Sequence, residues 1–222
     1  MNLKGLKINF LGDSITEGVG TSCKENTYPE VLKRMAELAE VRNYGMGGTR
    51  YAIQKGTEAR PKNDAEDINS FSERFNQMDD DADVVVIFGG VNDWGHGDAP
   101  LGTFEDRDPE TFYGACHYLY SGLMRKYLGK TIVILTPLHA LGELNIPKAK
   151  PGGNYGNLKT YVNIIREVAE FYSLPVLDLY AVSGLQPAVK EIKEEYVPDG
   201  LHPNDKGNMV IAEKLKAFLE IL

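Results

Sequence analysis

The sequence has few cysteines, no excess of basic residues and no long apolar run. Its two cysteines, Cys23 and Cys116, form neither a metal-ligand spacing nor a disulfide framework, so both are expected as free or buried thiols. The formal charge of -8, with Lys and Arg scattered, argues against nucleic acid or an anionic membrane surface as a partner. No segment has transmembrane length and no signal peptide is present. These features predict a cytoplasmic protein, or a secreted one if a leader has been removed.

Strand-like and helix-like segments alternate along the 222 residues. Four apolar, β-branched runs of strand length occupy residues 6–11, 83–88, 131–135 and 175–179, and residues 40–44 are a fifth, shorter candidate. Their nearly continuous apolarity is typical of parallel strands that are covered on both faces. Helical apolar stripes fall at residues 28–39, 71–78, 109–127, 157–172 and 204–222. This order predicts one domain, residues 1–222, folded as a three-layer α/β/α sandwich around a parallel sheet.

Polar and glycine-rich residues follow several of these strands. The groups are residues 12–14 (GDS), 43–48 (NYGMGG), 89–93 (GGVND) and 197–203 (VPDGLHP). In a parallel sheet they converge on one edge, and two long connections, 93–108 and 138–156, emerge there as well. Ligands bind at this edge of open α/β sheets.

An acid, an imidazole and a hydroxyl stand among these groups. Ser14 occupies a position where serine commonly caps a helix, but where it could also act as a nucleophile. His202 on its own is compatible with a solvent-facing histidine. Asp199 lies three residues earlier, and the surrounding proline and glycine residues exclude a regular helix. A turn can therefore bring the carboxylate onto the imidazole, as in a site that orients a catalytic base.

The glycines and Asn92 have two interpretations. Gly47 and Gly48, like the pair at 89–90, are compatible with tight turns alone, and Asn92 with a capping role. The functional alternative is that a glycine N–H and the Asn92 side-chain amide donate to an oxyanion. The combination of acid, base, hydroxyl, amide and glycine backbone at successive strand ends predicts acyl transfer.

Four sequence blocks resemble those of the GDSL, or SGNH, hydrolases. Residues 12–15 (GDSI) are similar to the first block, with Ile15 where many members have Leu. Residues 43–48, 90–93 and 199–202 resemble the second, third and last blocks, so the match spans almost the whole chain. The resemblance implies a flavodoxin-like fold with a central sheet of five parallel strands. It also implies ester hydrolysis without a metal or other cofactor.

The resemblance assigns roles to individual residues. His202, oriented by Asp199, takes the proton of Ser14, which attacks the ester and forms an acyl-enzyme. The N–H groups of Ser14 and Gly48 and the side chain of Asn92 bind the oxyanion.

The position of the oxyanion glycine has an alternative. Thr49 follows Gly48 directly, where many members have an intervening residue before the threonine. That departure makes Gly47 the other candidate. The spacing from Asn43 favours Gly48.

The substrate is indicated only by the loops. They hold no long apolar stretch for a fatty chain, which favours a small acyl group, such as acetyl, on a polar alcohol such as a carbohydrate or oligosaccharide. Possible substrate contacts are Asp13, which is also expected to hold its turn, Trp94, which could instead pack the long loop, and His96. There are two alternatives. One is a lysophospholipase or thioesterase with broader acyl tolerance, and the other is a non-catalytic binding module on the same fold. No signature of an oligomeric state is present.

Overall fold

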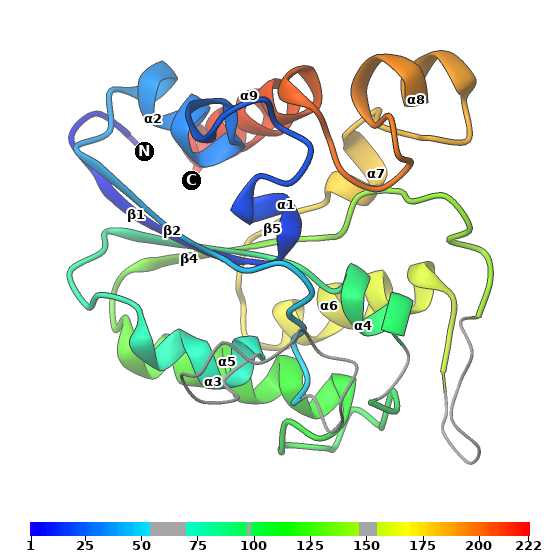
Figure 1. Cartoon of the computed structure of the whole chain (residues 1–222). Coiled ribbons are helices and arrows are strands. Elements are labelled where there is room, and N and C mark those ends of the chain that lie inside the picture. Colours follow the sequence, from blue (N-terminus) through cyan, green and yellow to red (C-terminus); the bar gives the residue numbers. More distant parts are fainter. Residues whose placement is uncertain (54–69, 97–98, 147–154) are drawn as a thin grey trace, which may run out of the picture.

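The computed structural model describes residues 1–53, 70–96, 99–146 and 155–222 (Figure 1). Within these ranges a five-stranded, all-parallel sheet has the order β2-β1-β3-β4-β5. Its strands are β1 (Lys7–Gly12), β2 (Glu40–Gly45), β3 (Val84–Phe88), β4 (Thr131–Leu135) and β5 (Val176–Leu177). The predicted α/β fold with a central parallel sheet is confirmed.

Two layers of helices cover the sheet, one on each face (Figure 1). The layer drawn above it contains α1 (Ser14–Glu17), α2 (Tyr28–Ala36), α7 (Leu179–Val182), α8 (Lys190–Tyr196) and α9 (Asp205–Ile221). The layer drawn below contains α3 (Phe71–Arg74), α4 (Val91–His96), α5 (Phe112–Lys126) and α6 (Leu158–Phe171). Two 3-10 turns, η1 (Lys24–Asn26) and η2 (Phe75–Gln77), complete the assigned elements.

Strand β3 shows why the strands are apolar throughout. Its residues 84, 86 and 88 pack into the core between the sheet and the layer with α2 and α9. Residues 85 and 87 pack into the core on the other face, between the sheet and the layer with α5 and α6. All five side chains are buried. Both faces of the sheet are therefore occupied, as parallel strands require.

Two predicted helices differ from the observed ones. The helix expected at 28–39 ends at Ala36, because Glu37 adopts a left-handed conformation with φ 50°. Met35, predicted on the apolar stripe, is consequently 38% exposed. The stripe at 71–78 is divided between α3 and the 3-10 turn η2.

The two chain ends lie together, at the side of the sheet away from the carboxyl ends of its strands (Figure 1). The amino group of Met1 donates to the carbonyls of Leu219 and Glu220, at 3.2 and 2.9 Å. Cys23 is an exposed and Cys116 a buried free thiol, as expected. None of the helices in the described ranges is long and apolar enough to span a bilayer.

Candidate active site

Three of the predicted site residues form one hydrogen-bonded series at the carboxyl edge of the sheet. Ser14 is the first residue of α1, separated from the end of β1 only by Asp13, and its Oγ lies 2.9 Å from Nε2 of His202. The other ring nitrogen, Nδ1, lies 2.6 Å from Oδ2 of Asp199. Ser14 and His202, 188 positions apart in the chain, thus meet where β1 ends and the loop before α9 passes.

The turn from Asp199 to His202 is fixed by its own backbone. Oδ1 of Asp199 accepts hydrogen bonds from the N–H groups of Leu201 and His202, at 2.8 and 2.7 Å. Gly200 has φ +82°, a left-handed conformation that favours glycine, and a Cβ there would lie 2.4 Å from the side chain of Leu141. The N–H of Leu141 in turn donates to the Gly200 carbonyl at 2.9 Å. The loop after β4 therefore supports the turn that carries acid and imidazole.

Asp199 is held in its ionised form. Burial alone raises the pKa of this carboxyl, but hydrogen bonds from the backbone N–H and ring of His202, and from Leu201, hold it below its ordinary value. An ionised carboxylate accepts the Nδ1–H of His202, which leaves Nε2 as the acceptor facing the Ser14 hydroxyl. This is the arrangement that a general base needs.

Backbone N–H groups beside Ser14 are available as donors. Ser14 is the first residue of its helix, so its N–H has no acceptor within the helix. Gly48 has φ +77° and open space where a Cβ would stand, and no described residue accepts its N–H. The N–H of Gly47 is already used, because it donates to Oε2 of Glu17 at 2.7 Å. The geometry therefore favours Gly48 over Gly47.

Asn92 lies at the start of α4 and faces the glycine loop. Its Nδ2 donates one hydrogen bond to the Thr49 carbonyl, at 3.0 Å. An amide nitrogen carries two hydrogens, so a second one remains for an oxyanion. Thr49 directly follows Gly48 in the chain, so this contact also holds Asn92 close to the glycine loop.

Asp93, which the sequence reasoning did not single out, anchors the same loop. The residue is 3% exposed, and its carboxylate accepts hydrogen bonds from the N–H groups of Tyr51 and Ala52, at 3.0 and 3.1 Å. Asp93 follows Asn92 directly, and this place in the third sequence block is the signal that could have identified it.

Arg74 is a second residue that the sequence reasoning missed. It is 6% exposed, on α3, and its Nη1 donates to the Tyr44 carbonyl at 2.8 Å. Its Nη2 donates to the Gly12 carbonyl and to Oγ1 of Thr49, both at 3.0 Å. Hydrogen bonds to main-chain carbonyls leave no spacing pattern, so no sequence signal marks this residue.

Asp13 is not open to a substrate, and the expectation of a substrate contact there is wrong. The residue is 1% exposed and caps α1, with Oδ1 accepting the Ile15 N–H at 3.0 Å. The expectation that Asp13 holds the turn is confirmed. Its Oδ2 has no hydrogen-bond partner among the described residues. Burial raises the pKa of this carboxyl to about 7, against the lowering effect of the Ile15 N–H.

Trp94 and His96 lie on α4, next to the site. The Trp94 ring packs on the apolar cluster that includes Ala140 and Leu158, and its Nε1 donates to the Asn145 carbonyl at 3.0 Å. Trp94 thus packs the long loop while part of its ring remains accessible. His96 is exposed at the end of the helix. Residues 97–98 and 147–154 of the two long loops lie outside the described part of the chain.

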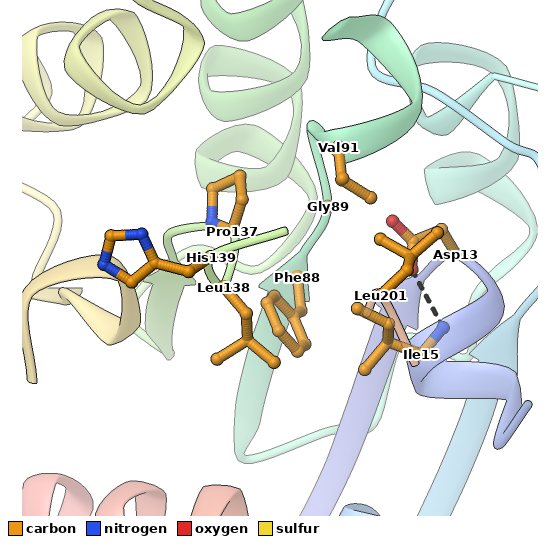
Figure 2. Close-up of a pocket in the computed structure, with 9 residues that line it drawn as sticks. All are labelled: Asp13, Ile15, Phe88, Gly89, Val91, Pro137, Leu138, His139 and Leu201. Carbon is orange, nitrogen blue, oxygen red and sulfur yellow. Dashed lines mark hydrogen bonds between the residues drawn. The ribbon is translucent and has the colours of Figure 1, made fainter. Parts of the chain in front are cut away.

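A narrow space lies near Ser14, lined by residues of several strand ends and loops. This mostly apolar space, between the turn after β1 and the loop after β4, is too small to admit a water molecule. Figure 2 shows the side chains that line it. The residues that line it include direct chain neighbours of site residues: Asp13, Ile15, Val91 and Leu201. Pro137, Leu138 and His139 come from the loop after β4.

A second histidine–carboxylate pair stands on that loop. Nδ1 of His139 lies 2.8 Å from Oε2 of Glu143, and the ring packs on Tyr180 with 3.9 Å between centroids. Nε2 of Gln186 donates to the same carboxylate at 3.3 Å. The pair braces the loop; over the described ranges no group of three or more His, Cys, Asp or Glu side chains is placed to hold a metal ion.

Comparison with known proteins identifies the family. The model of the GDSL-like lipase/acylhydrolase family matches residues 10–210, and the chain belongs to this family of hydrolases. One solved structure has a TM-score of 0.84 and 34% identity, over 100% of this chain and 99% of that one. A Lactobacillus plantarum protein has a TM-score of 0.79 and 29% identity, over 98% of each chain.

A curated relative carries a specific activity. It is an acetylxylan esterase of Xylanibacter ruminicola, 26% identical over 97% of this chain. The match covers 43% of that relative, so this chain spans less than half of its length.

Proposed function

We propose that the protein is a serine ester hydrolase that removes small acyl groups, above all acetyl, from a polar alcohol such as a carbohydrate. The hydrogen-bonded series from Ser14 through His202 to Asp199 carries the catalytic part of this proposal. Membership of the GDSL-like family and the likeness to an acetylxylan esterase support the choice of ester.

The reaction proceeds in two steps through an acyl-enzyme. Nε2 of His202 accepts the Ser14 proton as Oγ attacks the ester carbonyl, and the carboxylate of Asp199 stabilises the imidazolium that forms. The oxyanion accepts hydrogen bonds from the N–H groups of Ser14 and Gly48 and from the Asn92 amide. His202 then protonates the departing alcohol. Water, deprotonated by His202, attacks the acyl-enzyme and releases the carboxylic acid.

The narrow space lined by Asp13, Ile15 and Leu201 supports a small acyl group, because it has no room for a long chain. One observation favours the alternative of a lysophospholipase or thioesterase. Leu144 and Ile146, on the loop after β4, are 77% and 60% exposed, and such a rim could hold a chain that lies along the surface. Acyl-chain preference therefore separates the two candidates.

The test is hydrolysis of p-nitrophenyl esters from acetate to palmitate, with Ser14→Ala and His202→Ala beside the wild type. Ser121→Ala, at a half-buried serine on α5 whose Oγ donates to the Tyr118 carbonyl, serves as the matched control. We expect fast release of p-nitrophenol from the acetate and slower release as the acyl chain lengthens. Both site variants should lose this activity, and the control should keep it. Rates that rise with chain length favour the alternative. Release that persists in Ser14→Ala contradicts the nucleophile, and no release from any ester points to a binding module.

A further inference from the structure

The two backbone donors of the proposed oxyanion hole come from separate segments. Ser14 follows β1, whereas Gly48 lies in the loop after β2. Stabilisation of an oxyanion depends steeply on donor position, and misplacement by about 1 Å can cost on the order of a hundredfold in rate. The relative position of these segments therefore matters to the chemistry.

One side chain ties the two segments together. Nη2 of Arg74 donates to the Gly12 carbonyl and to Oγ1 of Thr49, both at 3.0 Å. Gly12 lies two residues before Ser14, and Thr49 directly follows Gly48. A single nitrogen thus spans from one donor segment to the other.

The remaining contacts fix Arg74 itself. Its Nη1 donates to the Tyr44 carbonyl near the end of β2, and its guanidinium lies 5.6 Å from the ring centre of Phe71. The hydroxyl of Thr49 donates onward to the Met46 carbonyl at 2.6 Å, which extends the network into the glycine loop. We propose that Arg74 is a positioning residue that sets the Ser14 and Gly48 donors relative to each other. This inference rests on the proposed ester hydrolysis.

The chemistry of the site requires arginine. A guanidinium presents several N–H groups in a rigid plane, so two of its nitrogens reach three acceptors at once, whereas a lysine ammonium is a single point of donation. Burial lowers the pKa of Arg74 to about 10, against the raising effect of nearby Asp13 and Glu17, so the group stays charged at neutral pH. Arg74 also faces these two carboxylates, and both belong to the turn and helix of the nucleophile.

The experiment compares Arg74→Ala and Arg74→Lys with Arg42→Ala. Arg42, on β2, is a matched control. Its replacement removes ion pairs with Glu40, Asp79 and Asp81 but no contact with the two donor segments. With p-nitrophenyl acetate we expect kcat to fall about 10- to 100-fold in both Arg74 variants while KM changes less than about twofold. Added guanidinium should restore part of kcat in Arg74→Ala and none in Arg42→Ala.

A second variant tests the bridge without altering the charge. Thr49→Val removes the hydroxyl acceptor, and we expect a smaller fall in kcat that is not additive with Arg74→Lys. Circular dichroism at the assay temperature shows whether each variant is folded. If Arg74→Ala does not fold, Arg74→Lys and Thr49→Val decide the matter.

The outcomes separate this inference from the proposed function. If the wild type is active and kcat is unchanged in the folded Arg74 and Thr49 variants, the positioning role is overturned and the proposed function stands. A fall in kcat that matches the unfolded fraction, without rescue by guanidinium, overturns it as well. A wild type that hydrolyses no ester overturns both proposals.

Discussion

The carboxylate of Glu17 accepts a hydrogen bond from the N–H of Gly47, with 2.7 Å between Oε2 and the nitrogen. Glu17 lies in α1, the helix that begins at Ser14. The helix of the proposed nucleophile therefore also holds the glycine loop. Because the N–H of Gly47 is used in this contact, it is not free to bind an oxyanion. Gly48 remains as the proposed oxyanion donor.

Replacing Glu17 tests this contact. Glu17→Ala frees the Gly47 N–H and releases the start of the loop, so we expect kcat to fall about tenfold with little change in KM. Glu17→Gln keeps an oxygen acceptor and should retain most of the activity. Steady-state hydrolysis of p-nitrophenyl acetate measures both. Equal activity in the two variants contradicts a role for this hydrogen bond.

Asn92→Ala removes the side-chain donor of the proposed oxyanion hole. We expect kcat to fall on the order of 100- to 1,000-fold, with KM close to that of the wild type, because the interaction strengthens only in the transition state. Asn163→Ala, an exposed amide on α6, is the control and should leave kcat unchanged. A variant that lost affinity rather than turnover would show that Asn92 binds the ground state.

Asp13→Asn should change the pH dependence of stability. Burial raises the pKa of Asp13 to about 7 in the folded chain, against 3.8 for an unperturbed carboxyl. Between these values the folded state holds a proton that the unfolded state has lost, so the free energy of unfolding falls as pH rises through this window. At about 1.4 kcal/mol per pKa unit, the free energy of unfolding of the asparagine variant should rise relative to that of the wild type by roughly 4 kcal/mol across this window. The difference should level off above pH 7.

Urea unfolding of both proteins between about pH 4 and pH 8 measures this difference. The gap between wild type and Asp13→Asn should widen with pH. A gap that stays constant would mean that Asp13 is ionised throughout, as an exposed carboxyl is.

Gly45→Ala should destabilise the fold at the site. A Cβ at Gly45 would lie 2.2 Å from the backbone nitrogen of Glu17 and 2.5 Å from the carbonyl carbon of Thr16, so β2 and α1 would have to separate. We expect a loss of about 1–3 kcal/mol or more. Gly95→Ala is the matched substitution, in α4, where the described residues beyond the helix's own backbone and the chain neighbours place no atom within 4 Å of the new Cβ, and it should gain about 0.5–1 kcal/mol. Equal denaturation midpoints would contradict this.

The strands and the longer helices could be predicted because their pattern extends over many residues. The boundaries expected for β4, residues 131–135, are those observed, since its apolar run is bounded by polar residues and proline. Helices α1, α4, α7 and α8 could not be predicted, because four to seven residues are too few to display a helical period. Glu37 ended α2 early through a left-handed conformation that composition does not encode.

The candidate site divides in the same way. Ser14 and Asn92 follow β1 and β3 and so lie at one edge of the parallel sheet, and His202 stands in the loop before α9. Arg74 and Glu17 act on backbone groups far away in the chain, and such contacts depend on distances in space. Sequence reasoning therefore finds residues that face the substrate more readily than those that hold them.

The pairing of Met1 with the carbonyls of α9 has a practical consequence. Because both chain ends leave the molecule at one place, remote from the carboxyl ends of the strands, an affinity tag or a fused module at either end should leave the catalytic edge accessible. A short peptide could also join the two ends. New termini could then be opened elsewhere, which would make the enzyme suitable for circular permutation or for insertion into a host protein.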